Sequence, residues 1–193
     1  QKKTDRRAYL VALGVALLPL LVFWQVHAFD FVTYDDGEYV YQNAYVAPGL
    51  TLEGVRWAFA TFHFGNWIPL TYLSHMLDAE LYGLDPAGHH GTSLLLHAAN
   101  SALLFLALLY LNRLGRRNAP GEEGKYLWPC AFVAAAFAVH PLHVEAVAWV
   151  SSRKDVLSTF FWFLALLAWG RYVKRPRPEW YAATLLCFVL GLM

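Results

Sequence analysis

Five long apolar runs alternate with polar segments along the chain and predict an all-α integral membrane protein. The runs cover residues 8–28, 91–111, 127–140, 156–173 and 180–193. A membrane-spanning helix needs about 20 mostly apolar residues, so this pattern predicts about five spans. The third run is the shortest, because Pro141 disfavours a helical His140 and removes a backbone donor. We predict a span that stops at His140, followed by an interfacial helix over residues 142–151. A kinked helix that runs on to Val150 is the alternative.

The segment between the first two runs, residues 29–90, is rich in aromatic side chains. Long loops without secondary structure are uncommon in compact domains, and this composition argues against disorder. We predict short helices within residues 50–62 and 69–84. The second has a leucine face and a polar face, which is typical of a helix lying on the membrane surface, or equally of one packed on an outer domain. The leucine face holds Leu70, Leu73, Leu77 and Leu81, and the polar face holds Thr71, His75 and Asp78.

Charge fixes the predicted orientation. All but three of the 15 lysines and arginines fall in residues 1–7, 112–125 and 170–178, and the exceptions are Arg56, Arg153 and Lys154. Basic residues favour the cytoplasmic side, so the N-terminus is predicted inside and residues 29–90 outside. The 58% hydrophobic and 15% charged content fits a membrane protein, since soluble domains are about 25% charged. A net charge of +1 gives no reason to expect a nucleic-acid partner.

The first candidate chemistry lies in "VTYDDGEY", just outside the first span, where Asp35 and Asp36 are followed by Glu38. Adjacent carboxylates near a low-dielectric surface repel, which can raise the pKa of one of them and suit it to general-base catalysis. Their oxygens could also bind a cation. The structural alternative is a turn in which the aspartates bond to nearby backbone.

The second candidate lies in "HPLHVEAVAWVSSRKD", at the outer ends of two spans. An arginine beside a lysine can neutralise a phosphate group, because the guanidinium offers a bidentate fork. The alternative is snorkelling of both side chains to lipid headgroups. The ionisable residues of this segment are His140, His143, Glu145, Arg153, Lys154 and Asp155.

Metal and nucleotide motifs are weak or absent in the sequence. The pattern HExxH does not occur, and Cys130 and Cys187 lack metal-type spacing, so we predict no metal site and leave a divalent metal cofactor open. His97 and Asn100 lie within the second apolar run, where hydrogen bonding between helices is their expected role. Neither a Walker loop nor GxGxxG occurs, which argues against nucleotide chemistry.

Four segments in order carry a family resemblance: "FVTYDDGEYVYQN", "GNWIPLTYLSHMLDAELYGLDPAGHH", "LLLHAANSALLFL" and "HPLHVEAVAWVSSRKDVLSTFFWFLAL". With them the chain resembles the N-terminal half of the TMTC-type O-mannosyltransferases and their bacterial relatives. These combine a multi-span domain with C-terminal tetratricopeptide repeats. The resemblance implies a GT-C fold, a polyprenyl-phosphate sugar as donor and an active site on the outer membrane face.

The resemblance also implies roles for individual residues. Asp35 and Asp36 match the acidic pair from which the base that deprotonates the acceptor hydroxyl is drawn. Four residues would contact the donor phosphate or shape its pocket, and four more would support them. The first four are Arg153, Lys154, His140 and His143, and the supporting residues are Glu145, Asp155, Glu38 and His90.

The sequence departs from this family because it has fewer apolar runs and no 34-residue repeat. We therefore interpret it as part of a longer protein, inactive alone, whose remainder carries the repeats. The predicted function is transfer of a sugar, with mannose as the candidate, from polyprenyl phosphate to a hydroxyl of a protein or glycan. The alternative is a non-catalytic membrane anchor or assembly subunit with an outer helical platform. The lack of an N-x-S/T sequon favours a bacterial inner membrane over the endoplasmic reticulum.

Overall fold

The computed structural model describes residues 2–115 and 124–193, with side chains over residues 6–114 and 124–193. These residues form helices and connecting turns without a β-strand, as predicted. The α-helices are α1 (Lys2–Val22), α2 (Leu52–Ala60), α3 (Pro69–Tyr82), α4 (Pro86–Gly115), α5 (Leu127–Val139), α6 (Val144–Ala148), α7 (Arg153–Lys174) and α8 (Pro178–Gly191). Short helical turns cover Trp24–Ala28 (η1), Gly37–Tyr41 (η2), Pro141–His143 (η3) and Val150–Ser152 (η4).

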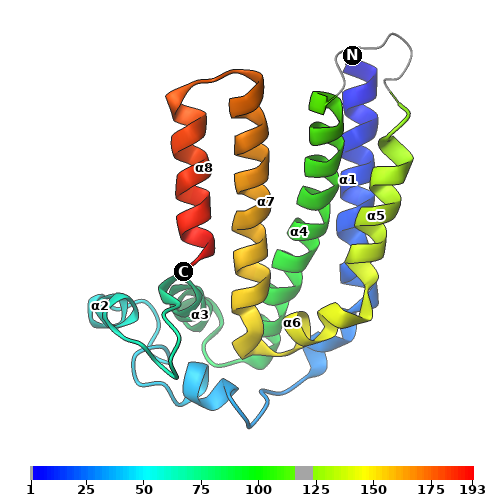
Figure 1. The fold of residues 1–193 in the computed structure, drawn as a ribbon. Coiled ribbons are helices and arrows are strands. Elements are labelled where there is room, and N and C mark those ends of the chain that lie inside the picture. Colours follow the sequence, from blue (N-terminus) through cyan, green and yellow to red (C-terminus); the bar gives the residue numbers. More distant parts are fainter. Residues whose placement is uncertain (1, 116–123) are drawn as a thin grey trace.

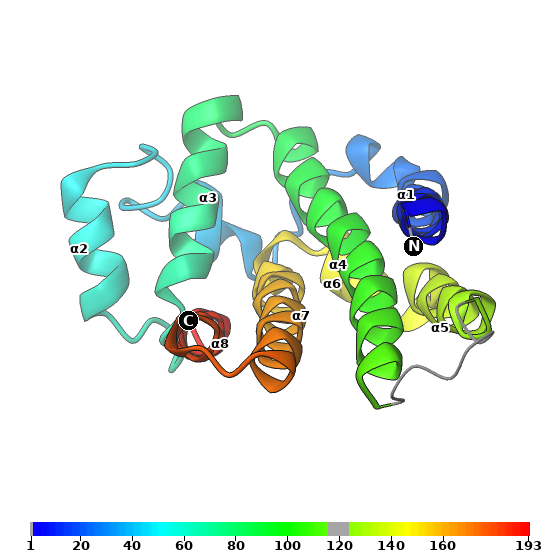
Figure 2. The same cartoon turned by 90° about the horizontal axis from the view of Figure 1, so that it is seen from above.

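Five of the helices, α1, α4, α5, α7 and α8, stand side by side (Figure 1). Helix α4 is central and packs against α1, α5 and α7, while α8 packs against α7. The view from above shows α2 and α3 to one side of this bundle (Figure 2). Residues 29–90 therefore lie at one end and along one side of the apolar helices.

The prediction of about five spans is not confirmed. Within the described residues, two helices are long and apolar enough to cross a membrane, residues 86–114 and 150–174. A third span results if α5 and the segment Pro141–Ala148 are counted together, although they meet at a bend of 49°. The apolar part of α1 is short, because charged residues precede Ala8 and the helix ends at Val22.

The bend after α5 has the predicted cause. His140 is extended, with φ −66° and ψ 130°, because it precedes Pro141. The α-helix therefore ends at Val139, and the chain resumes as the turn η3 and the five-residue helix α6. The helix expected over residues 142–151 is thus represented by α6 between two short turns, η3 and η4.

Both short helices predicted within residues 29–90, here called the outer segment, are present as α2 and α3. Thr51 caps α2 by accepting a hydrogen bond from the backbone N–H of Gly54 at 3.0 Å. Helix α3 starts with Pro69 in its first turn and is followed by Gly83, whose φ of +64° suits glycine. A buried cluster fixes this segment onto the junction before α7; its members are Tyr39, Val40, Val46, Ala58, Tyr72, Met76 and Val150.

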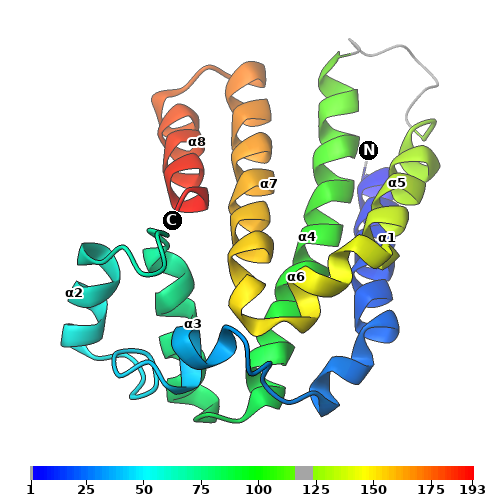
Figure 3. The same cartoon turned by 60° about the horizontal axis from the view of Figure 1, so that its bottom comes forward.

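Helix α3 turns its polar face into the protein. Thr71, His75 and Asp78 are buried, whereas Leu77 and Leu81 are 45% and 61% exposed. Both interpretations of this helix are compatible with this burial, because the polar face packs on the protein and the leucine face is exposed. Figure 3 shows α3 beside the lower half of α7 and below the last turn of α8. Burial of polar side chains needs partners, and α3 finds them on α4 and α7.

The charge sorting of the sequence has a spatial counterpart. The start of α1 lies at the same end of the bundle as the connection between α7 and α8 (Figure 1). Arg171 and Lys174 are in the last turn of α7, and Arg177 follows in the connection. Arg153 and Lys154 begin α7 at the opposite end. The described residues do not include 116–123 of the basic segment 112–125, nor Gln1 of the segment 1–7. The assignment of the first end to the cytoplasm stays a prediction.

Candidate active site

A buried ion pair between Arg153 and Asp78 joins α7 to α3. Arg153 Nη1 lies 2.5 Å from Asp78 Oδ2, and both side chains are excluded from solvent. The guanidinium also donates to Ser93 Oγ at 3.3 Å and to the backbone carbonyls of His89 at 2.6 Å and Ser74 at 3.3 Å. A positive side chain in the first turn of a helix is unfavourable for the helix dipole, and the carboxylate offsets this. Arg153 is therefore fully engaged within the protein.

The carboxylate of Asp78 gathers further polar groups of α3 and α4. Its Oδ1 accepts a hydrogen bond from Thr92 Oγ1 at 2.8 Å, and its Oδ2 lies 3.6 Å from His89 Nδ1. His75, one turn earlier on α3, stacks against His89 with ring centroids 6.3 Å apart. Burial, with the positive charge of Arg153 and the neighbouring His89, lowers the pKa of His75 well below its usual value. The His75 imidazole is therefore neutral.

Asp36 joins the outer segment to the start of α7. Its Oδ2 accepts a hydrogen bond from the backbone N–H of Val32 at 2.8 Å, and its Oδ1 accepts one from that of Ser151 at 2.9 Å. The side chain is fully buried, and its charge also interacts with Arg153 and His90. Asp36 of the predicted acidic pair and Arg153 of the predicted cationic pair therefore lie close to each other. Both the turn-like and the functional interpretation of Asp36 are compatible with these bonds.

The predicted site residues separate by burial. Asp36, His90 and Arg153 are buried together, whereas Glu38, His140, Glu145 and Asp155 are exposed, and Asp35, His143 and Lys154 are half-buried. The charge of Asp155 interacts with those of Lys154 and Glu145, which places these three near each other at the surface. The role of each residue stays a prediction.

His140 and His143 form a separate group with α4 and α5. The ring of His143 lies 5.0 Å from that of His97 and 4.3 Å from that of Phe137, centroid to centroid. His140 contacts His143 at 6.2 Å and its Nδ1 accepts a hydrogen bond from the Leu142 N–H. His97 bonds to the Ala138 carbonyl at 3.1 Å and Asn100 to that of Val156 at 2.8 Å, so both link helices as expected.

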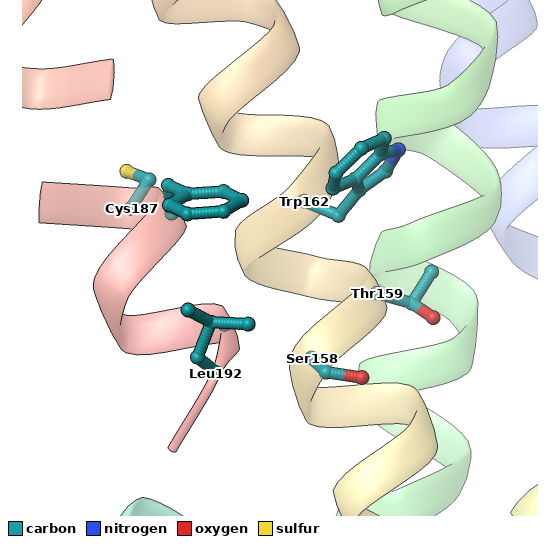
Figure 4. Close-up of a pocket in the computed structure, with 7 residues that line it drawn as sticks. Ser158, Thr159, Trp162, Cys187 and Leu192 are labelled. Atoms are coloured by element: carbon teal, nitrogen blue, oxygen red, sulfur yellow. The ribbon is translucent and has the colours of Figure 1, made fainter. Parts of the chain in front are cut away.

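A groove runs between α7 and α8 and reaches the start of α7. Its upper part is a pocket of about 280 Å³ lined by Ser158, Thr159, Trp162, Cys187, Phe188, Gly191 and Leu192. Figure 4 shows these side chains on the two helices. The lower part shares Ser158, Gly191 and Leu192 and adds Lys154, Asp155, Ile68 and Thr71. A cation and a carboxylate thus stand at the polar end of a mainly apolar groove.

Sequence reasoning did not select Asp78, His75, Ser93 or Thr92 as site residues. The available signal was the polar face of α3, where His75 and Asp78 are three residues apart on a helix that also has a leucine face. A buried carboxylate requires a positive or hydrogen-bonding partner. Sequence alone did not identify Arg153 as that partner, because 75 positions separate the two residues.

Known relatives support the resemblance noted in the sequence. Protein O-mannosyl-transferase TMTC4 of Homo sapiens is 31% identical over 185 residues, which cover 86% of this chain and 24% of that protein. Human TMTC2 is 30% identical over 190 residues, or 93% of the chain and 20% of that protein. Protein O-mannosyl-transferase Tmtc1 of Drosophila melanogaster is 33% identical over 128 residues, or 66% and 13%. The resemblance to TMTC-type O-mannosyltransferases is confirmed.

The chain spans between 13% and 24% of the length of these three TMTC proteins. No protein-family model and no solved structure matches it. The three relatives come from a fly and from human, so they give no support to the predicted preference for a bacterial inner membrane. Together, the structure and these relatives describe a helical membrane protein that resembles TMTC proteins.

Proposed function

We propose that this chain forms part of a membrane glycosyltransferase that transfers a sugar, with mannose as the candidate, from a polyprenyl-phosphate donor to a hydroxyl acceptor. The names of the TMTC relatives support transfer of mannose to protein. The observation that carries the proposal is the groove between α7 and α8, with Lys154 and Asp155 at its outer end and Trp162, Phe188 and Leu192 above. A lipid phosphate needs this combination, a cation for the headgroup and an apolar path for the chain.

Lys154 is assigned to the donor phosphate. Its neighbour Arg153 is fully buried and held by Asp78, Ser93 and two backbone carbonyls, so it supports the site from within the protein. Lys154 is half-buried and lines the groove. Positive charge beside the leaving phosphate stabilises the negative charge that develops there during transfer.

Asp35 is assigned as the general base. Inverting transfer requires a carboxylate near the acceptor hydroxyl to remove its proton. Both oxygens of Asp36 already accept backbone hydrogen bonds, which suits it to position the segment. The half-buried Asp35 carboxylate forms no hydrogen bond or ion pair with another described residue, so its oxygens are free to accept a proton.

The test is sugar transfer by the full-length parent protein with a polyprenyl-phosphate mannose donor. Lys154→Met is expected to lower kcat/KM for the donor by roughly 10- to 100-fold, because a charge-assisted hydrogen bond contributes about 1.5–3 kcal/mol. Lys174→Met is the matched control, since it removes the same side chain from the other end of α7. Unchanged kcat/KM in Lys154→Met would reject the phosphate assignment.

The base assignment needs its own comparison. Asp35→Asn should reduce kcat while leaving donor binding intact, and Glu53→Gln, which changes an exposed carboxylate on α2, serves as the control. Undiminished turnover in Asp35→Asn would exclude it as the base. If the parent protein transfers no sugar from any polyprenyl-phosphate donor yet binds a partner through its outer segment, the non-catalytic anchor is the better description.

A further inference from the structure

The cluster around Asp78 contains two histidines that the ion pair with Arg153 does not satisfy. His75 and Asp78 come from α3, and His89 comes from the first turn of α4. One ligand atom from each of the three side chains lies within 4.8 Å of the others, and all three residues are buried. Two imidazoles and a carboxylate at such spacing are a donor set that transition-metal ions use in proteins.

The hydrogen bond of His89 fixes which of its nitrogens faces the cluster. His89 Nε2 lies 3.2 Å from the carbonyl oxygen of Gly83, and a carbonyl can only accept. Nε2 therefore carries a proton, and in the neutral ring Nδ1 presents a lone pair toward Asp78 Oδ2, 3.6 Å away. A cation placed between them would bind this lone pair and share Asp78 Oδ2 with Arg153 Nη1.

The two ring nitrogens of His75 also lack hydrogen-bond partners. Its side chain is fully buried, and neither ring nitrogen has a hydrogen-bond partner among the described residues. Buried polar groups in proteins are nearly always paired, so each exception calls for an explanation such as a bound ion or water.

We propose that His75, Asp78 and His89 hold one divalent transition-metal ion, of the Zn²⁺ type, which fastens α3 to α4. Ligand atoms lie about 2 Å from such an ion, so the three side chains must close by about 1 Å. The site is buried, and its three protein ligands leave the fourth position of a tetrahedral zinc ion to a water molecule. This inference does not depend on the sugar transfer proposed above.

The groups around the three residues fit the outer shell of a metal site. Metal-bound histidine usually donates its other ring N–H to a backbone carbonyl, as His89 does to Gly83. Metal-bound carboxylates are in turn hydrogen-bonded, and Asp78 receives Thr92 and Arg153. The charge of Asp36, which also interacts with Arg153, helps to offset the added positive charge. Nitrogen and oxygen ligands favour Zn²⁺ over Ca²⁺ or Mg²⁺, which prefer oxygen alone.

The experiment uses the purified chain in detergent, treated with a chelator and then dialysed against Zn²⁺ or Co²⁺. We expect one ion per chain by mass spectrometry of the metal, and at least a tenfold loss of affinity in His75→Gln and in His89→Gln. His27→Gln is the control, because His27 bonds only its own backbone neighbour, the Trp24 carbonyl, among the described residues. Equal metal content in wild type and His75→Gln would overturn the proposal.

A second variant guards against loss of folding. His75→Cys keeps a ligand at this position, so it should retain Co²⁺ and add the absorption band of a cobalt–thiolate bond, which the wild-type chain should lack because Cys130 and Cys187 are not in the cluster. Absence of that band in a folded His75→Cys chain contradicts the proposal. So does a wild-type chain that binds no Co²⁺, in which case water satisfies the two histidines.

Discussion

Removing the guanidinium of Arg153 should destabilise the outer segment by about 3–5 kcal/mol, because the buried carboxylate of Asp78 would lose its ion-pair partner. Arg153→Met keeps much of the side-chain volume and removes the charge. It also leaves Ser93 Oγ and the carbonyls of Ser74 and His89 without their donor. At about 2–4 °C per kcal/mol for a chain of this size, the melting temperature should fall by roughly 6–20 °C.

The assay is thermal unfolding of the purified chain in detergent, followed by tryptophan fluorescence, with a chelator present throughout so that metal binding does not contribute. Lys154→Met is the control, since it removes the neighbouring charge from a half-buried position and should change stability by less than about 0.5 kcal/mol. A double variant, Arg153→Met with Asp78→Leu, should regain much of the loss, because the carboxylate that paired directly with Arg153 is then also absent. Strictly additive losses in the double variant would refute the ion-pair explanation.

Three other substitutions test separate parts of the structure. Asp36→Asn should lower the free energy of unfolding by about 1–3 kcal/mol, because the N–H group of either Val32 or Ser151 would then face an amide donor. Chemical unfolding of Asp36→Asn, with Glu38→Gln as the control, measures this difference. Gly170→Leu should cost about 1–3 kcal/mol because a Cβ there lies 2.7 Å from the Tyr110 ring where α7 crosses α4, whereas Gly14→Leu, with open space, should be tolerated in the same assay. Burial raises the pKa of Tyr72, with the nearby Tyr39 contributing, so the folded state keeps a proton that the unfolded state loses above about pH 10. Stability should therefore fall by up to about 1.4 kcal/mol per pH unit above that value, and Tyr72→Phe should remove this part of the slope.

Several features of the fold follow from local sequence. The apolar runs predict the helices, and the pre-proline conformation of His140 predicts the end of α5. The helix over residues 69–84 is visible as a 3.6-residue pattern. The span count was less reliable, because apolar content does not set helix length; α1 ends at Val22.

The candidate site was likewise only partly predictable from the sequence. Its acidic pair and its basic pair are local properties of composition and charge. The sequence does not tell that Arg153 turns inward to Asp78 while Lys154 lines the groove, since consecutive residues on a helix point about 100° apart and only the neighbouring helices decide which one is buried.

The sequence by itself determined that this chain is a helical membrane protein with its acidic cluster and its Arg–Lys pair on one side, because hydrophobic period and charge sorting act over a few neighbouring residues. Only the tertiary structure decided which charges pair, which histidines are left without partners and where a groove opens. Those outcomes depend on packing between α3, α4, α7 and α8, whose contacting residues are widely separated in the chain and are brought together only when buried polar groups find partners.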